Sequence, residues 1–454
     1  MCGLIVHETA FTMNPTRAGE ARQRLFNQGA RPMRRAKFGK SWVIGAALFA
    51  LLGGVIAPGS HAASPITVSI WTYGNVIDPA LIAQYQKLHP AIKIVAKKSD
   101  LDGNAQALRY ALPSSAVPDI AAVEISYMGE FRNYTQYLTD LSTLTPSSTT
   151  IKDQFLGWRW NGMVADTGQV LGIPTDVGGL AVAYRVDLFK KAGLPTDPAA
   201  VSALWPTWDK FIATGKQYVA KQKGKAFIDI AQTIYTAVVN QGAQKYYDNS
   251  GNLIYSNNPN IQSAFNYTAA ASQAILGTNV AQYSPDWNVG LNKGLYATVL
   301  APAWMLQYIK QYAPKTTGLW NVATLPGSAG NQGGSALTIP THAAHTQEAW
   351  DFIRWYTAAA QQKYEFVHNL TFPTVTSLYT DPAVGGLKDK FFNNAPIGKI
   401  YSSSVNAVQP FQLGKKDRLI DSTIGQALSR VQLGKQLPQA AWTQAMSDIK
   451  RAIN

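Results

Sequence analysis

The sequence predicts an α/β protein, and three observations lead to this prediction. Strand-like and helix-like segments alternate from residue 66 onward, an order typical of a parallel sheet covered by helices. The chain has 454 residues, of which 46% are apolar, so it can bury a large core. Because this length exceeds that of one ordinary domain, the sequence also favours two lobes.

The first elements establish the alternation. Residues 66–71, ITVSIW, have the apolar, β-branched character of a strand. Asp78 followed by Pro79 predicts a helix N-cap with proline at the first helical position, and Pro90 predicts the end of that helix. The next segment, IKIVAKK at 92–98, places isoleucines at alternate positions and is therefore expected to be a second strand.

A third strand is expected within PDIAAVEIS at 118–126. In parallel α/β sheets, ligands bind beyond the carboxyl ends of the strands. Trp71 and Glu124 are both expected at such ends, so two strand tips are predicted to point at one place.

The remaining chain continues the pattern. Residues 225–320 are expected to be mostly helical, and one long helix capped by Thr346 is expected over 346–366. Trp350, Trp355 and Trp442 fall on helical faces and are predicted to be core residues. The other expected strands and helices lie at 180–184, 319–326, 335–340, 205–221 and 439–453.

The amino-terminal 62 residues are interpreted as an upstream extension plus a secretory signal peptide. A basic stretch precedes the apolar run at 42–56, and the small residues Ser60 and Ala62 fit the positions before a cleavage site. We expect the natural start at Met33 and the cut after Ala62. An uncleaved anchor helix is the alternative, although the run is short for a membrane span.

Charge and cysteine content exclude several classes. The segment 1–62 holds eight Lys or Arg and two Asp or Glu, so the net charge of +14 becomes 32 − 24 = +8 without it. The basic residues are scattered, whereas a nucleic-acid surface would cluster them. Cys2 is the only cysteine and lies in the expected leader, so no disulfide, thiol nucleophile or lipid anchor is expected in the mature chain. With only 15% charged residues, the surface is expected to suit acidic surroundings.

At this level the chain resembles the extracellular solute-binding proteins of carbohydrate ABC importers, the family 1 sugar-binding type that includes maltose-binding protein. The resemblance rests on segments that occur in family order across residues 66–454; Arg185 replaces an asparagine that is common in the family. The segments are PDIAAVE, YLTDLSTL, GIPTDVGGLAVAYRVDLFKKAGLP, WPTWDKF, NKGLYATVLAPAWM, WNVATLPGS, GGSALTIP and EAWDFIRWY.

The resemblance implies a two-lobed periplasmic-binding-protein-like fold of type II, with the ligand cleft between the lobes. It places residues 64–176 and 323–370 in lobe I and residues 177–322 and 371–454 in lobe II. It further implies high-affinity binding of a sugar or oligosaccharide, delivery to the membrane permease of an ABC importer, and no catalysis.

The residue types also suit a sugar. Aromatic rings stack on the C–H faces of a pyranose, and carboxylates and amides bind its hydroxyl groups. The competing structural roles are core packing for Trp71, a hinge salt bridge for Glu124 and a turn cap for Asp176, while the resemblance assigns stacking to Trp304. The expected ligand-binding residues are Trp71, Asn75, Glu124, Tyr127, Asp176, Asp286, Trp287, Trp304, Gly334, Ser335 and Phe372.

No cofactor or metal is expected, because His342 and His345 lack an evident third ligand. We expect an exported, unlipidated monomer in the periplasm or at the cell surface, with a carbohydrate ligand, permease subunits as partners and no nucleic acid. Two alternatives stay open. One is the same fold binding a polyamine, an anion or iron, and the other is a secreted glycoside hydrolase, which needs a pair of carboxylates around the scissile bond.

Overall fold

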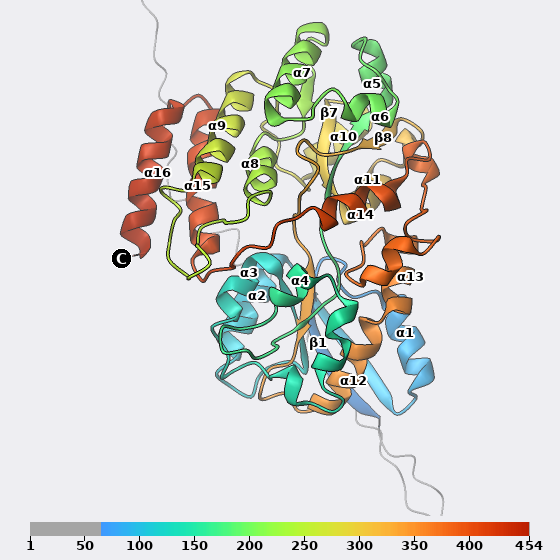
Figure 1. Ribbon diagram of the computed structural model, residues 1–454. Helices are drawn as coiled ribbons and strands as arrows, with labels where there is room; N and C mark the ends of the chain where they lie inside the picture. Colours follow the sequence, from blue (N-terminus) through green and yellow to red (C-terminus); the bar gives the residue numbers. More distant parts are fainter. Residues whose placement is uncertain (1–64, 454) are drawn as a thin grey trace, which may run out of the picture. The chain divides into compact units, whose positions relative to one another are not determined.

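The computed structural model describes residues 65–453 (Figure 1). The expected leader, with its start at Met33 and its cut after Ala62, lies outside the described residues. Within 65–453, no helix combines the length and the apolar character that a membrane crossing requires.

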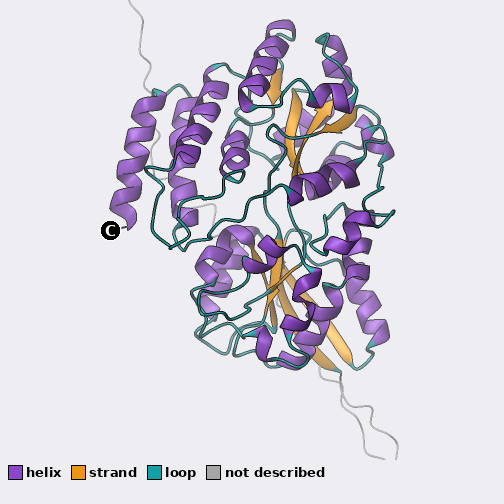
Figure 2. Ribbon diagram, viewed as in Figure 1, coloured by secondary structure: helices purple, strands orange, loops and turns teal. Residues whose placement is uncertain are grey.

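The described chain forms two mixed sheets with helices packed around them, which confirms the predicted α/β class (Figure 2). The strands of the first sheet are β1 (Ile66–Tyr73), β2 (Ile92–Ser99), β3 (Ile120–Glu124), β4 (Ile173–Pro174) and β9 (Ser335–Thr338). The strands of the second sheet are β5 (Leu180–Arg185), β6 (Ala226–Ile228), β7 (Tyr296–Pro302) and β8 (Trp320–Ala323).

Sixteen α-helices lie in the described residues. In chain order they are α1 (Pro79–Leu88), α2 (Leu101–Ala111), α3 (Ile125–Phe131), α4 (Gly157–Asn161), α5 (Val186–Lys191), α6 (Pro198–Ser202), α7 (Trp208–Lys221), α8 (Gln232–Val239), α9 (Pro259–Gln273), α10 (Pro285–Lys293), α11 (Ala303–Tyr312), α12 (Thr346–Tyr356), α13 (Ala359–Asn369), α14 (Ile397–Asn406), α15 (Asp417–Gln432) and α16 (Pro438–Ile453).

The first sheet has the order β2-β1-β3-β9-β4. β1 pairs in parallel with β2 over its whole length and with β3 at its centre, while β9 runs antiparallel to both β3 and β4. The expectation that the first strand ends at Trp71 was wrong, since β1 continues to Tyr73 because Thr72 and Tyr73 still pair with β2.

The second sheet has the order β6-β7-β5-β8. β6 runs parallel to β7, and β5 runs antiparallel to both β7 and β8. Its strands come from the interval between β4 and β9, so the chain leaves the first sheet, builds the second and returns. The lobe boundaries at 176/177, 322/323 and 370/371 stay predictions.

The predicted first helix is confirmed in detail. The Asp78 side chain accepts a hydrogen bond from the Ala80 N–H at 2.7 Å, and Pro79 is the first residue of α1. The cap therefore satisfies one of the amide groups that a helix start leaves unpaired.

The predicted single helix over 346–366 was wrong, because the chain forms α12 and α13 with a break at Thr357 and Ala358. The Gln362 side-chain amide donates to the Thr357 carbonyl at 2.9 Å and so replaces the next helical partner. Thr346 is the first residue of α12 and not its cap, a position that His345 occupies without a side-chain hydrogen bond.

The expected core tryptophans pack as predicted. Trp350 is fully buried, while Trp355 and Trp442 are partly buried against two hydrophobic clusters of the core. Fully burying a large apolar side chain, as at Trp350, stabilises the fold by about 1.5–3 kcal/mol.

Candidate functional site

The segments that connect the two sheets meet at one junction. The Thr175 N–H donates to the Ser335 carbonyl at 2.9 Å, and the Ser335 N–H donates to Asp176 Oδ1 at 2.8 Å. The Val177 N–H donates to the Phe372 carbonyl at 3.0 Å. Three stretches that are far apart in the sequence are therefore held together by backbone groups and by the Asp176 carboxylate.

Gly178 allows the stretch around Asp176 to approach the stretch around Ser335 this closely. The Gln332 N–H donates to the Gly178 carbonyl at 2.7 Å. A Cβ atom added at Gly178 would lie 1.8 Å from the Gln332 carbonyl oxygen, so no other residue fits without moving the backbone.

A fully buried arginine lies beneath the junction. Arg159 of α4 donates from Nε to the Asp176 carbonyl at 3.2 Å and from Nη2 to the Ser335 carbonyl at 2.9 Å. Burial lowers the pKa of Arg159 and raises the pKa of Asp176 and of Glu124, while the attraction between these opposite charges counteracts each shift. The junction is therefore built around a buried group of charges that stabilise one another.

Glu124 ends β3 and caps α3. Its Oε2 accepts hydrogen bonds from the Ser126 N–H at 2.8 Å and from the Ser126 hydroxyl, which fixes the carboxylate. Its Oε1 has no hydrogen-bond partner among residues 65–453. One oxygen thus holds the helix, and the other is available to accept a hydrogen bond from a ligand.

Trp304 comes from the other sheet and approaches the same point. It lies where β7 ends and α11 begins, and it is partly exposed. A Cβ atom added at Gly333 would lie 3.6 Å from Trp304 Nε1 and 3.7 Å from Glu124 Oε1. The structure therefore brings Glu124, Trp304 and the Gly333 loop together, although they are distant in the sequence.

Gly334 and Ser335 belong to the framework beneath this point. The Gly334 carbonyl accepts from the Ile125 N–H at 3.0 Å, and the Ser335 hydroxyl lies 2.6 Å from the Tyr73 hydroxyl. Ser335 and Asp176 are both buried in the described structure. The contacts of Gly334, Ser335 and Asp176 hold the Gly333 loop in position.

Trp287 and Asp286 differ sharply in their surroundings. Trp287 is fully buried, and its indole N–H donates to Asp229 Oδ2 at 2.9 Å, so it presents no surface to a ligand in this structure. Asp286 is exposed in the first turn of α10. Burial raises the pKa of Asp229 to about 6, and a hydrogen bond from the Gln282 side chain at 2.7 Å counteracts the shift.

The same loop carries an aromatic residue that the sequence analysis missed. The ring of Tyr283 lies 6.4 Å from that of Trp304, centroid to centroid, and 44% of Tyr283 is exposed. The available signal was a tyrosine directly before the SPDWN segment. Choosing the tryptophan of that segment overlooked its exposed neighbour.

Charged side chains contact both the hydroxyl and the ring of Tyr127. Its hydroxyl donates to Asp102 Oδ1 at 2.5 Å and accepts from Arg418 Nη2 at 3.0 Å. The Arg418 guanidinium also lies 4.4 Å from the centre of the Tyr127 ring. One ring face and the hydroxyl are therefore already occupied.

Trp71 and Asn75 contact lysines of β2. The Lys97 ammonium lies 5.4 Å from the centre of the Trp71 ring, and Lys98 donates to the Asn75 side-chain oxygen at 2.9 Å. Trp71 is partly buried and Asn75 is exposed. These contacts place both residues beside β2.

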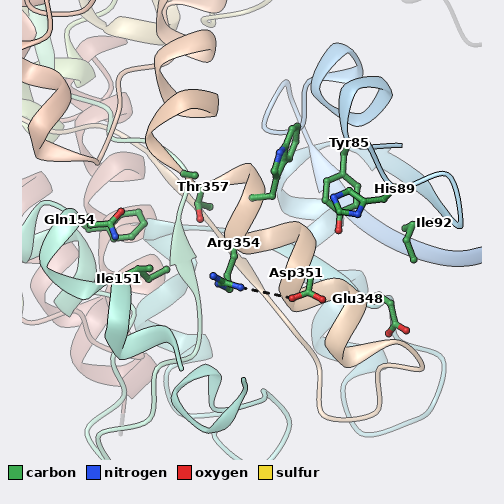
Figure 3. A pocket seen from close by; sticks show the side chains of 12 residues that line it. Tyr85, His89, Ile92, Ile151, Gln154, Glu348, Asp351, Arg354 and Thr357 are labelled. Atoms are coloured by element: carbon green, nitrogen blue, oxygen red, sulfur yellow. Dashed lines mark ion pairs between the residues drawn. The ribbon is translucent and has the colours of Figure 1, made fainter. Parts of the chain in front are cut away.

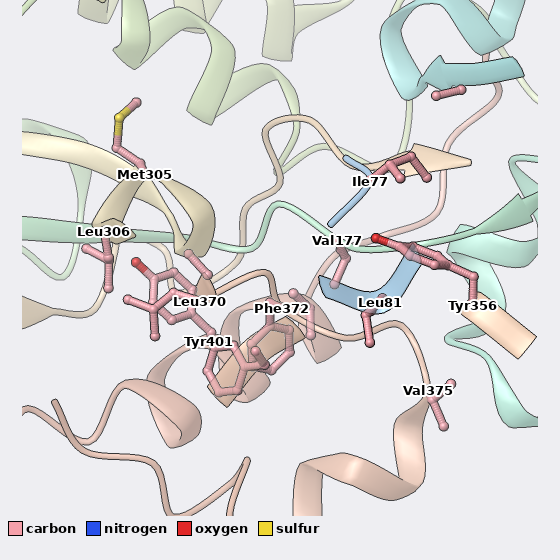
Figure 4. Close-up of a cluster of buried hydrophobic side chains, with 14 of the residues drawn as sticks. Ile77, Leu81, Val177, Met305, Leu306, Tyr356, Leu370, Phe372, Val375 and Tyr401 are labelled. Atoms are coloured by element: carbon pink, nitrogen blue, oxygen red, sulfur yellow. The ribbon is translucent and has the colours of Figure 1, made fainter. Parts of the chain in front are cut away.

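Phe372 lies within the hydrophobic core of the junction (Figure 4). It is fully buried, and its ring contacts Phe366 edge-on with the centroids 5.0 Å apart. Phe372 packs the core beside Val177 at the junction, and it has no free surface for a ligand in this structure.

Two surface pockets lie elsewhere. The first, of about 670 Å³, is lined by residues including Tyr85, His89, Asp351 and Trp355 (Figure 3). The second, of about 610 Å³, lies along α16. Neither pocket is lined by any of the expected ligand-binding residues, so we locate the candidate site from the convergence of Glu124, Trp304 and Gly333. Within the described part of the chain, no group of three or more His, Cys, Asp or Glu residues is placed to hold a metal ion.

Comparison with known proteins defines the class. The two sheets and the crossings between them form the two-lobed fold of periplasmic sugar-binding proteins. A crystal structure of an extracellular solute-binding protein of family 1 is 32% identical, with a TM-score of 0.78, and the match covers 86% of this chain and 100% of that one. The family model described as bacterial extracellular solute-binding protein matches residues 73–363, and the chain belongs to this family.

Two further relatives have known ligands in their names. An arabinooligosaccharide-binding protein of Halalkalibacterium halodurans is 26% identical over 278 residues, which cover 58% of this chain and 60% of that protein, less than two thirds of its length. The ABC transporter associated binding protein of B. animalis subsp. lactis, solved with β-1,6-galactobiose, is 20% identical with a TM-score of 0.71, covering 86% of this chain and 98% of that one. The likeness to the second protein concerns the fold alone.

Proposed function

We propose that this chain binds a sugar or oligosaccharide between two lobes and delivers it to the permease of an ABC importer. The observation that carries the proposal is the convergence of Glu124 Oε1 and Trp304 Nε1, each within 4 Å of one point at Gly333. The family of the chain and the arabinooligosaccharide named for one relative support it.

The chemistry of this point suits a sugar. The Trp304 ring offers a flat apolar face for the C–H groups of a pyranose, and the Glu124 carboxylate accepts from its hydroxyl groups. The N–H groups of Gly333 and Gly334 donate to no partner among the described residues and add two donors. The Glu124 carboxylate disfavours an anion, whereas a polyamine could pair with this carboxylate and lie against the Trp304 ring, so the experiment below includes spermidine.

The lobes of the proposal are residues 64–176 with 323–370, and residues 177–322 with 371–454. Ligand that contacts both lobes favours the closed arrangement, because it gains contacts there that the open arrangement lacks. In the proposal the protein is an exported, unlipidated monomer that leaves its ligand chemically intact.

A thermal-shift panel tests the proposal. Protein that begins at residue 63 is heated with arabino-, galacto-, malto-, cello- and xylo-oligosaccharides and, separately, with spermidine and phosphate. A ligand at 100 times its Kd stabilises the folded state by about 2.7 kcal/mol and raises the Tm. We expect one sugar series to raise the Tm, and Trp304→Ala and Glu124→Gln to abolish or weaken the rise.

The matched control is Tyr110→Ala, since Tyr110 is an exposed aromatic residue of α2 outside the candidate site. It should keep the full response to sugar. A rise with spermidine or phosphate and none with any sugar would overturn the substrate class. Shortened sugar products in the bound fraction by mass spectrometry would instead indicate a glycoside hydrolase.

A further inference from the structure

Aromatic residues form a strip that leads away from the candidate site along one helix. Trp304, Tyr308 and Tyr312 recur at every fourth position of α11, so they share one face of this helix. Tyr283, in the loop before α10, joins them. We call these four residues the α11 strip.

The rings of the α11 strip contact one another in sequence. The centroids of Trp304 and Tyr283 lie 6.4 Å apart, those of Tyr283 and Tyr308 lie 5.4 Å apart, and those of Tyr308 and Tyr312 lie 4.2 Å apart. Tyr283 is 44% exposed and Tyr312 is 40% exposed. Tyr312 lies eight positions after Trp304, a distance of about 12 Å along the helix axis. The strip is thus continuous, exposed and longer than a single ring.

The backbone of Tyr283 indicates that its position serves a purpose beyond packing. Its φ of +66° is in the left-handed region, which is unfavourable for a bulky side chain. Buried Asp229 keeps the loop in place, because its backbone carbonyl accepts from the Thr278 N–H at 2.9 Å and its carboxylate accepts from Gln282. A glycine or asparagine would satisfy this backbone with less strain, yet the chain holds a half-exposed tyrosine there.

Amide side chains lie beside the α11 strip, and the one charged side chain of α11 is held in an ion pair. The Asn292 side chain donates to the Tyr312 carbonyl at 2.6 Å and to the Asn288 carbonyl at 2.9 Å. Lys310, on the same helix, is paired with Asp389 at 2.6 Å. Aromatic faces with amides beside them suit a ligand that is uncharged and carries both C–H faces and hydroxyl groups.

We propose that the α11 strip is an outer extension of the sugar site, which binds the further units of an oligosaccharide whose first units lie at Trp304. This inference rests on the proposed function and adds to it the length of the substrate: a chain of several sugar units. Continuity with Trp304 distinguishes the strip from an isolated exposed patch, because its inner end is part of the candidate site itself.

The test compares ligand lengths by isothermal titration calorimetry. The probes are the disaccharide and the hexasaccharide of each sugar series in the thermal-shift panel. We expect the hexasaccharide of the active series to bind the wild-type protein about tenfold more tightly than the disaccharide. Tyr312→Ala should weaken hexasaccharide binding about two- to tenfold, the range of one aromatic stacking contact, and leave disaccharide binding unchanged.

Two controls accompany this variant. Tyr312→Phe keeps the ring and should bind both lengths as the wild type does. Tyr110→Ala removes a tyrosine that is 74% exposed on α2 and should also change neither affinity. A fold that is damaged by Tyr312→Ala would weaken both lengths, which separates this effect from the expected one.

The remaining outcomes overturn the inference. Equal affinity of both lengths, or hexasaccharide binding that Tyr312→Ala leaves unchanged, contradicts the extension while the proposed function stands. A Tyr312→Ala variant with unchanged affinities but reduced transport in proteoliposomes would assign the strip to permease docking. If only monosaccharides bind, the extension is wrong, and if no sugar binds, the proposed function fails together with it.

Discussion

Replacing Glu365 by glutamine should make the protein more stable at alkaline pH. Glu365 lies on α13 behind the junction and is buried. Burial raises the pKa of Glu365 to about 7; a hydrogen bond from Asn369 opposes this shift and the negative charge of Asp78 adds to it. Its carboxyl oxygens lie 3.0 Å from the Tyr356 hydroxyl and 3.0 Å from the Asn369 side-chain nitrogen.

The hydrogen bonds around Tyr356 can accommodate Glu365 in either protonation state. The Tyr356 hydroxyl accepts from the Asp78 N–H at 2.9 Å and lies 3.0 Å from the Val76 carbonyl, which can only accept. Its single proton can go to the Glu365 carboxylate, which lowers the pKa of Glu365, or to Val76, in which case a protonated Glu365 can donate to the hydroxyl. The side-chain amide of glutamine at position 365 can likewise donate to the Tyr356 hydroxyl, and its oxygen can likewise accept from the Asn369 side chain.

The magnitude follows from the shift. A change from 4.5 to about 7 corresponds to ~2.5 pKa units, or about 3.4 kcal/mol. Between these values the folded state binds more protons than the unfolded state, so this contribution is complete below pH 4.5 and is lost as the pH rises through 7. Glu365→Gln should be unaffected by this loss. Over the 389 residues from 65 to 453, an unfolding entropy of ~2.1 cal/mol/K per residue converts the difference into a Tm gain of about 4 °C at pH 8.

Urea and thermal unfolding at pH 5 and pH 8 check the prediction. The wild type and Glu365→Gln should be similar at pH 5, and the variant should be more stable at pH 8. Asp153→Asn removes one exposed charge and serves as the control. A gap between wild type and Glu365→Gln that does not change with pH would refute the reasoning. Buried Asp229 and Asp417, whose pKa values burial raises to about 6, act in the same direction, so the wild type should lose stability from pH 5 to pH 8.

Three further substitutions test the framework of the site. Asp229→Ala leaves the buried Trp287 N–H without its acceptor and should cost about 1–3 kcal/mol in urea unfolding, while Asp229→Asn, which keeps an oxygen there, should cost less. Gly178→Ala places a Cβ atom 1.8 Å from a backbone oxygen and should prevent soluble expression, whereas Gly425→Ala, with open space at its Cβ position in α15, should raise the Tm slightly. Arg159→Met removes the cation that faces two buried carboxylates and should cost about 3–5 kcal/mol, measured by the urea midpoint at pH 7; a loss below 1 kcal/mol would show that the buried charges do not depend on one another.

The sequence predicted the features that depend on near neighbours. The cap at Asp78, the alternation of strands and helices, and the position of Glu124 at the end of β3 follow from local patterns, and the structure confirms them. Trp287 could not be judged locally, because its indole binds Asp229, 58 residues away in the sequence. The break at Thr357 likewise depends on the Gln362 side chain. Its amide donates to the Thr357 carbonyl, which would otherwise accept from a backbone N–H of a continuous helix.

The position of β9 has a consequence for how the protein is made. β9 lies between β3 and β4, and β4 pairs only with β9 in the described sheet. About 160 residues separate β4 from β9 in the chain, so the ribosome must synthesise the whole second sheet before the first can close. Closing so long a loop slows folding through its entropy. A nascent chain that stops before Ser335 therefore lacks the strand that completes its first sheet, and the edges of β3 and β4 that pair with β9 stay unpaired until β9 has been synthesised.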